Sequence, residues 1–441
     1  MTLSVLMAAR EAPSSLALVL GETRLTFAEL AERVRARTEE LRGREAPFAF
    51  VATPELDVFV SLYACLELRL PFVPIHPKLP VAERTRRLAE GGAFCPVGRE
   101  GEEAALACVY TSGTAGLARA VELSRRAFTA AAAASAARLG WRDDDRWLLA
   151  LPVAHVGGLS ILIRCLLARR PVVVATGASF APDEILELLS RDGVSLCSLV
   201  PAQLERLLDA APEASPPGKL RVVLLGGAGA KPALLERARA FGWPVLATYG
   251  LTETCAQVAT QRPGTHAGGV GEPLEGVGVR VVDGVVEVRT PALMTAFHPG
   301  GVAPALTSDG WFRTGDLGRI DGAGALWVTG RGDEVIVTGG EKVAPAEVEQ
   351  VLEGCAGVAS ACVFGVEDPV WGQLVAAAIV TAPPAPDVRE LARELGAKLA
   401  TFQRPRRLAV LDTLPLNAAG KIDRKAVARE AAGKLVPLLP D

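Results

Sequence analysis

The chain has 441 residues, of which half are apolar and 22% are charged. This balance excludes global disorder and a minimal binding module, and the length predicts two or three domains, or one large domain with a small appendage. The 47 basic and 50 acidic residues give a net charge of -3, which leaves no bulk attraction toward nucleic acid or an anionic membrane. An anionic ligand must therefore be held by local geometry.

Cysteine usage and the apolar tracts predict a cytoplasmic protein. The eight cysteines form no C-x-x-C pair, so we expect buried thiols in a reducing compartment. Residues 1–10 carry no basic residue ahead of their apolar stretch, which excludes a secretory signal. The longest apolar tract, residues 148–168, contains Pro152, His155 and Arg164, and these make a bilayer costly for it.

The first two thirds of the chain alternate between helical patterns and short apolar runs. Thr26 and Glu29 form a capping box that predicts a helix start, and the alanine run at 130–134 predicts another helix. Apolar runs predict strands at residues 48–52, 106–110, 172–175, 196–200, 220–225 and 245–248. This alternation is typical of helices packed on largely parallel sheets.

The pattern changes in the last third. Residues 279–289 read as two alternating strands joined by an Asp283-Gly284 turn, which predicts a small antiparallel subdomain or barrel. We then expect a separate small α+β core, with elements at residues 345–352 (helix), 358–366 and 374–381 (strands), and a second helix after the proline-rich break at 383–386. The predicted fold is α/β, with a large N-terminal domain at 1–331 and a small C-terminal domain at 332–441.

The sharpest local signal lies at residues 109–119, where a strand runs into a loop with two glycines and three hydroxyl side chains and ends in Arg119. Such a loop makes room for phosphate oxygens and donates hydrogen bonds to them. It is not a Walker loop, because G-x-x-x-x-G-K-[ST] is absent. Taken alone, it is more often a solvated turn.

Four further motifs accompany this loop, at residues 249–254, 315–317, 330–333 and 415–424. With them, the chain resembles the superfamily of adenylate-forming enzymes that includes acyl-CoA synthetases, peptide-synthetase adenylation domains and firefly luciferase. The motifs run in the family's order with its spacing. The resemblance implies an acid-thiol ligase that forms an acyl adenylate from ATP, with Mg²⁺ as cofactor and CoA as the second substrate.

The resemblance also assigns roles within the N-terminal domain. Attack of a carboxylate on the α-phosphorus of ATP brings two anions together, so a metal and fixed donors are needed. Thr252 matches a contact to the α-phosphate and Glu253 matches the Mg²⁺ ligand. The residues matching the other ATP contacts are Thr111, Ser112, Gly113, Thr114, Gly116, Arg119, Tyr249, Asp316 and Arg331. Of these, Tyr249 would stack near adenine, and Asp316 and Arg331 would contact the ribose hydroxyls.

Each residue also has an ordinary structural interpretation. Asp316 would be a turn residue, Glu253 a carboxylate at a helix start, and Tyr249 a packed ring. The loop departs from the family pattern, because Ala115 stands where a threonine is usual and Arg119 where a lysine is usual. Since a guanidinium is a planar fork and not a point charge, binding of MgATP is expected to be weaker than is typical.

In the C-terminal domain, the resemblance implies a mobile lid. Lys421 matches the lysine that reaches the carboxylate and the α-phosphate, and Asp333 falls on the hinge position. Gly339, Gly340 and Glu341 match the loop presented to the site for thioester formation, which favours transfer to a thiol over release of the adenylate. Asp333 could equally be a linker residue, and Lys421 a surface lysine.

The residues that would choose the acid resemble those of o-succinylbenzoate-CoA ligases of menaquinone biosynthesis. The similar segments are residues 151–164, 224–228 and 249–258. The unpaired charge of Arg164 in an apolar helix needs an anionic partner, either an acidic side chain or the second carboxylate of a diacid. His155 is either a core histidine or a wall of the acyl pocket. Gly226, Gly227 and Ala228 would let the acyl group lie against the backbone.

Three functions remain open at this level: a CoA ligase for o-succinylbenzoate or a close aryl acid, an adenylation enzyme that loads a free-standing carrier protein, and a silent relative that binds nucleotide. The expected partners are the small-molecule acid, ATP and CoA, with no nucleic acid and no membrane. The sequence leaves open whether the chain forms a homodimer.

Overall fold

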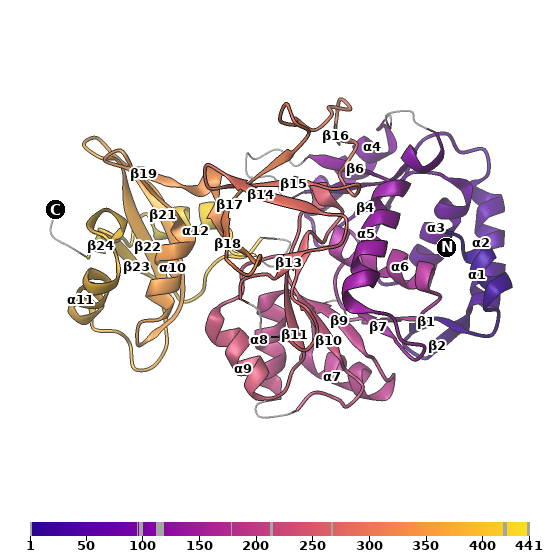
Figure 1. Ribbon diagram of the computed structural model, residues 1–441, viewed down its shortest axis with the longest axis horizontal. Helices are drawn as coiled ribbons and strands as arrows, with labels where there is room; N and C mark the ends of the chain where they lie inside the picture. Colours follow the sequence, from indigo (N-terminus) through magenta and orange to yellow (C-terminus); the bar gives the residue numbers. More distant parts are fainter. Residues whose placement is uncertain are drawn as a thin grey trace. The chain divides into compact units, whose positions relative to one another are not determined.

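The computed structural model describes residues 2–94, 96, 100–111, 119–177, 179–211, 215–265, 268–417 and 421–438. The chain forms two compact units (Figure 1). The first contains Met1–Arg280, Val288–Phe312 and Asp321–Leu326, and the second contains Val281–Glu287, Arg313–Ile320 and Trp327–Asp441. The α/β class with a large N-terminal and a small C-terminal part is confirmed.

The N-terminal unit is built on two sheets. The larger has nine strands in the order β13-β12-β11-β10-β9-β7-β8-β1-β2. In chain order these are β1 (Leu16–Leu20), β2 (Thr23–Thr26), β7 (Trp147–Leu149), β8 (Val172–Val174), β9 (Leu196–Leu199), β10 (Val222–Leu225), β11 (Val245–Tyr249), β12 (Ala259–Thr260) and β13 (Glu272–Pro273). Its central strands run parallel, as the apolar runs predict.

The smaller sheet has five strands in the order β16-β6-β5-β4-β3. They are β3 (Phe48–Val51), β4 (Phe72–Ile75), β5 (Ala105–Tyr110), β6 (Ala120–Ser124) and β16 (Ala296–His298). The strands β3, β4 and β5 are parallel, whereas β6 is antiparallel to both of its neighbours.

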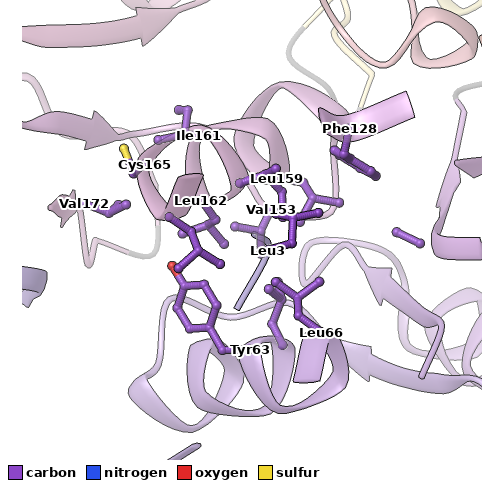
Figure 2. Packing of buried hydrophobic residues seen from close by; sticks show 14 of the residues in the cluster. Leu3, Tyr63, Leu66, Phe128, Val153, Leu159, Ile161, Leu162, Cys165 and Val172 are labelled. Carbon is purple, nitrogen blue, oxygen red and sulfur yellow. The ribbon is translucent and has the colours of Figure 1, made fainter. Parts of the chain in front are cut away.

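The helices of this unit form layers on both sheets. Trp147 and Leu149 face one buried cluster while Leu148 faces another, so both faces of the nine-stranded sheet are covered. The middle layer is α3 (Leu56–Leu68), α5 (Arg125–Leu139) and α6 (Val156–Ala168), whose packing Figure 2 shows. The outer helices are α4 (Val81–Gly92), α7 (Pro182–Arg191), α8 (Pro201–Ala210) and α9 (Pro232–Ala240), and α1 (Val5–Glu11) and α2 (Phe27–Leu41) pack beside α3.

The C-terminal unit contains a sheet in the order β20-β19-β22-β23-β24, with β21 paired to β22. Its strands are β19 (Ile336–Thr338), β20 (Glu341–Val343), β21 (Val358–Asp368), β22 (Gly372–Thr381), β23 (Arg407–Val410) and β24 (Val436–Pro437). The helices are α10 (Pro345–Glu353), α11 (Val388–Lys398) and α12 (Arg424–Ala431). A four-stranded sheet joins β14 (Gly278–Val282), β15 (Val285–Arg289), β17 (Phe312–Ile320) and β18 (Leu326–Arg331).

Several local predictions are confirmed. The Thr26 hydroxyl accepts a hydrogen bond from the Glu29 N–H at 3.3 Å while the Glu29 carboxylate accepts one from the Thr26 N–H at 2.8 Å. Asp283 and Gly284 have φ of 51° and 76°, the pair of positive angles that a two-residue hairpin needs. The described cysteines are free, buried thiols.

The compact units differ from the predicted division at residue 331, because segments of β14, β15 and β17 group with the later part of the chain. Strand pairing explains this, since neighbours in a sheet pack together wherever they lie in the sequence. The place where a mobile lid would begin stays a prediction. Among the described residues, none of the helices is long and apolar enough to cross a membrane.

Candidate active site

The loop predicted to bind phosphate connects β5 and β6. The Thr111 N–H donates to the Arg119 carbonyl at 2.9 Å, and the Thr111 hydroxyl donates to the same oxygen at 3.2 Å. The two ends of the loop are therefore closed by one pair of residues. The Arg119 guanidinium lies over the Phe297 ring at 5.7 Å. The other predicted loop residues, Ser112, Gly113, Thr114 and Gly116, lie outside the described residues, as does Ala115.

The turn that carries Thr252 and Glu253 follows the carboxyl end of β11. It is a single 3-10 turn, η2 (Thr252–Thr254), held by a hydrogen bond from the Met294 N–H to the Glu253 carbonyl at 2.8 Å. A Cβ on Gly250 would lie 1.3 Å from the Ala256 carbonyl oxygen, so only glycine fits before the turn. Thr252 and Glu253 are half-buried.

The residues predicted for the acyl pocket lie on the carboxyl side of neighbouring strands. Gly226 directly follows β10. A Cβ added to it would lie 2.7 Å from the Thr248 methyl carbon, so the backbone of Gly226 lies close to the Thr248 side chain. Gly227, with φ of +79°, and Ala228 are exposed. Because β10 and β11 are parallel, these residues and Tyr249 share the edge where α/β sheets bind ligands.

His155 lies at the start of α6, where it meets a residue of the other sheet. Its ring centroid is 5.2 Å from that of His76, which follows β4. Burial, followed by the nearby Lys78 and Arg87, lowers the pKa of His76. The sequence prediction missed His76, although its place after a buried apolar run is a signal for the carboxyl edge of a strand.

Arg164 is buried within α6, with 4% of its surface exposed. Its guanidinium carbon lies 5.4 Å from the centre of the Trp147 ring. Within the described part of the chain, it forms no ion pair, and Nε and Nη2 have no hydrogen-bond acceptor. Burial lowers the pKa of Arg164 to about 10, an effect opposed by Cys255 and Cys165. Cys255 directly follows η2, so the cation lies near the turn that carries Thr252 and Glu253.

Arg164 also lines a narrow gap, too small to hold a water molecule, together with α5 and the first residues of β7 and β9. The surrounding side chains are almost all apolar, and include those of Ala132, Leu139 and Leu196. His155 and Arg164 thus lie at different levels of one helix, nine residues apart at about 1.5 Å per residue. The structure does not bring these two side chains into contact.

In the C-terminal unit, Arg331 connects the predicted ribose contact to the predicted hinge. Its Nη1 lies 3.1 Å from Asp316 Oδ1 and its Nε lies 3.0 Å from Asp333 Oδ1. Burial acts to lower the pKa of Arg331, but the two carboxylates outweigh it and the pKa is raised. Asp316 is itself buried. The three predicted residues therefore form one charged cluster.

Gly339 and Gly340 form the turn between β19 and β20, with φ of +58° and +88°. The Gly339 N–H donates to the Trp371 carbonyl at 2.9 Å, and a Cβ on Gly339 would lie 2.7 Å from the Trp371 ring. The Arg406 guanidinium lies over the same ring at 4.7 Å. Trp371 and Arg406 were not predicted, because their contact with this turn joins distant parts of the sequence.

Lys421 lies at one end of a short loop whose residues 418–420 are outside the described residues. The Asn417 N–H donates to the Lys421 carbonyl at 2.7 Å, and the Lys421 N–H donates to the Asn417 side chain at 3.1 Å. The adjacent pair Leu416 and Ile422 forms a β-bridge. The backbone of Lys421 is thus fixed while its side chain is exposed.

Comparison with known proteins identifies the relatives of this chain. Residues 95–292 match the model of AMP-binding enzymes, and residues 347–421 match that of the AMP-binding enzyme C-terminal domain. The 2-succinylbenzoate-CoA ligase of Bacillus licheniformis is 32% identical over 93% of this chain and 96% of its own. The corresponding ligase of Bacillus subtilis is 30% identical over 96% and 97%.

Solved structures agree with these sequence matches. The o-succinylbenzoate CoA synthetase from Bacillus subtilis, in complex with its acyl-adenylate intermediate, superimposes with a TM-score of 0.86 at 30% identity over 96% of each chain. The same enzyme in complex with ATP and a magnesium ion also gives 0.86, at 29% identity over 96% of this chain and 98% of its own.

The contact between Gly339 and Trp371 yields a stability prediction with a matched control. Alanine at Gly339 or Gly340 forces a positive φ, which costs about 1–2 kcal/mol. Only Gly339→Ala also meets the Trp371 ring. Because that ring is 41% exposed and can shift outward, we expect an additional loss near the low end of the overpacking range, about 1 kcal/mol. The measurement is the free energy of unfolding in urea, and equal losses for the two variants would contradict the contact.

Proposed function

Since this chain belongs to the family of AMP-binding, adenylate-forming enzymes, we propose that it is an ATP-dependent acid-CoA ligase whose acid is o-succinylbenzoate or a similar aryl acid. It activates the carboxylate as an acyl adenylate and transfers the acyl group to CoA. Such a reaction belongs to menaquinone biosynthesis. The observation that carries the substrate assignment is the unpaired guanidinium of Arg164.

A buried cation without an anion is costly, and its cost is relieved when an anion binds. Within the described residues, Arg164 has no ion-pair partner, which argues against a structural salt bridge. o-Succinylbenzoate has two carboxylates, so one can react while the other is held. We assign the second carboxylate to Arg164, and we place His155 and the backbone of Gly226, Gly227 and Ala228 along the acyl group. Because Arg164 lies beside the first residues of β7 and β9 while Gly226 follows the end of β10, this assignment requires the space around Arg164 to open when the acid binds.

The adenylation half of the reaction uses the edge formed by β5, β10 and β11. Thr252 contacts the α-phosphate, Tyr249 lies by the adenine, and Arg119 with the rest of its loop holds the outer phosphates. The carboxylate of Glu253 is a hard oxygen ligand on a fixed turn, which fits Mg²⁺. The ion, when bound, neutralises phosphate charge. Asp316 and Arg331 hold the ribose hydroxyls, and Lys421 contacts the reacting carboxylate and α-phosphate.

The thioester half uses the turn of Gly339, Gly340 and Glu341. Glycine backbone at this turn leaves a narrow path for pantetheine. The exposed Trp371 ring offers an apolar surface beside the turn, and Arg406 adds a positive charge to it. Both features suit CoA, which carries an adenine ring and phosphates. Asp333 is the proposed hinge residue between the two half-reactions.

For partners we propose only the small molecules: the acid, ATP and CoA. The net charge of -3 and the near balance of acids and bases support the exclusion of nucleic acid and of membranes. The free, buried cysteines support a cytoplasmic location.

The direct test of the function is a substrate panel. Pyrophosphate release and CoA-thioester formation are followed by mass spectrometry with o-succinylbenzoate, benzoate, anthranilate and medium-chain acids. We expect both products with o-succinylbenzoate at the highest kcat/KM. Pyrophosphate release without a CoA thioester would point to a carrier protein as the acceptor, and no release with any acid would point to a silent nucleotide-binding relative.

Lys421→Ala is expected to nearly abolish adenylate formation from acid and ATP, yet largely spare thioester formation from preformed acyl adenylate. The reason is that a lysine on a mobile domain serves only one of two arrangements. Lys425→Ala, which removes an exposed lysine from α12, is the control and should leave both half-reactions intact. An equal loss in both half-reactions for Lys421→Ala would contradict this division.

Glu253→Gln is expected to raise the Mg²⁺ concentration needed for half-maximal adenylation and to lower its rate, because the metal loses an anionic oxygen ligand. The measurement is the adenylation rate over a Mg²⁺ titration. Glu275→Gln, at an exposed position of the same unit, should show the wild-type titration. If Glu253→Gln did so as well, its carboxylate would have only a structural role.

Arg164→Leu is expected to penalise o-succinylbenzoate strongly and to leave a monoacid analogue, without the second carboxylate, nearly unaffected. Losing a buried charge-assisted contact costs about 2–5 kcal/mol, which is visible in kcat/KM. Comparing both acids with both proteins isolates the coupling, since a general folding defect cancels. A parallel loss for the two acids, with a lower melting temperature, would mean that Arg164 is structural.

A further inference from the structure

Three chemically reactive side chains come from three neighbouring strands of the five-stranded sheet. Cys108 on β5 is the direct cross-strand partner of Glu122 on β6, and Glu122 is the partner of Ala296 on β16. His298 lies two residues beyond Ala296. Since paired residues share a face of a sheet and alternate residues return to it, the register places Cys108, Glu122 and His298 on one face.

The side chains meet in the interior of the N-terminal unit. Cys108 and Glu122 have no exposed surface, and His298 is 2% exposed. The Cys108 sulfur, a Glu122 carboxylate oxygen and a His298 ring nitrogen all lie within 4.8 Å of one another. A hydrogen bond of 2.7 Å joins His298 Nε2 to Glu122 Oε2. The Phe94 ring stacks on His298, with centroids 5.0 Å apart.

We propose that Cys108, Glu122 and His298 bind one Zn²⁺ ion, with water as a fourth ligand. A thiolate, an imidazole and a carboxylate are the donors that zinc prefers among protein side chains. This cluster selects a different metal from the site proposed at Glu253. Thiolate and imidazole are poor ligands for Mg²⁺, whereas the Glu253 site offers a carboxylate oxygen. When the ion binds, the Cys108 proton leaves to solvent, and the His298 proton that bridges Nε2 and Glu122 moves to Nδ1, so that Nε2 can bind the ion.

The hydrogen bond between Glu122 and His298 does not explain why the Cys108 thiol lies beside them. The hydrogen bond satisfies His298 Nε2 and one oxygen of Glu122, whereas Cys108 contributes nothing to that pair. Cys108 is fully buried beside the Glu122 carboxylate, its direct cross-strand partner. A divalent ion neutralises both acidic groups in a region where unpaired charge is costly.

The spacing of the ligand atoms is close to what zinc needs. With bonds of about 2.0–2.3 Å in a tetrahedral arrangement, ligand atoms are roughly 3.5 Å apart. In the present structure one separation is 2.7 Å and all three are within 4.8 Å. Side-chain rotations can therefore bring the three atoms to that spacing while the backbone pairing of β5, β6 and β16 is kept. Bound zinc would join the three strands, two of which flank the predicted phosphate loop.

The test uses the full-length protein, freed of metal by a chelator, dialysed and then loaded with Zn²⁺ or Co²⁺. We expect about one tightly bound zinc per chain by elemental analysis and a higher melting temperature with Zn²⁺. With Co²⁺ we expect a thiolate-to-metal charge-transfer band in the near ultraviolet. This band reports cysteine ligation, so it separates the cluster from a site made by His76 and His155 alone.

Three variants decide the assignment. Cys108→Ser should lose the Co²⁺ thiolate band, while Cys197→Ser, which removes a buried thiol from β9, should keep it. His298→Gln retains all cysteines and should weaken Zn²⁺ binding at least about 10-fold. The His298→Gln variant therefore tests zinc binding even if Cys108→Ser does not fold. Survival of the band in Cys108→Ser, unchanged affinity in His298→Gln, or no bound zinc in the wild-type protein would overturn the proposal.

Discussion

The burial of α6 on every side is the constraint on which the candidate site depends. Its residues from Val156 to Ala168 are nearly all apolar, and the helix lies in the layer between two sheets. A helix in that position must face apolar groups in all directions. It also places His155, at its start, against His76 from the other sheet. The carboxyl edges of both sheets are brought together at that point.

The burial of α6 also bears on the proposed role of its one charged residue, Arg164. In a helix whose surroundings are apolar, a guanidinium without an acidic partner raises the free energy of the empty protein. Among the residues that the structure describes, Arg164 contacts the Trp147 ring and is influenced by the thiols of Cys255 and Cys165, with no carboxylate beside it. Under the proposed assignment, binding of the second carboxylate recovers that free energy, so an acid with a second negative charge would be favoured over a monoacid of similar shape. Specificity would then come from an unpaired cation more than from the shape of the pocket.

Much of the fold could be predicted because its signals are local. The central parallel strands appear as continuous apolar runs, and the capping box at Thr26 and the turn at Asp283 and Gly284 are set by neighbouring residues. The order of the motifs gave the family. Contacts between distant segments could not be predicted in this way. His298 and Glu122 are 176 residues apart in the sequence, and only the pairing of β16 with β6 brings them together. Trp371 reaches Gly339 across a shorter separation, through the pairing of β19 with β22.

The cluster of Asp316, Arg331 and Asp333 links the proposed ribose contact to the proposed hinge. Arg331 shares its guanidinium between the two carboxylates, so a pair of hydroxyls that hydrogen-bonds to Asp316 or Arg331 would compete with the ion pair between them. Asp333 lies in η3 (Gly332–Glu334), between β18 and β19, where a few backbone rotations reorient all that follows. Glu334, next along the chain, pairs with Arg424 at the start of α12, so the hinge segment is held to the helix that follows Lys421. If Asp316 binds the ribose as proposed, the ion pairs of Arg331 and Arg424 form a physical connection from that contact to the segment that carries Lys421.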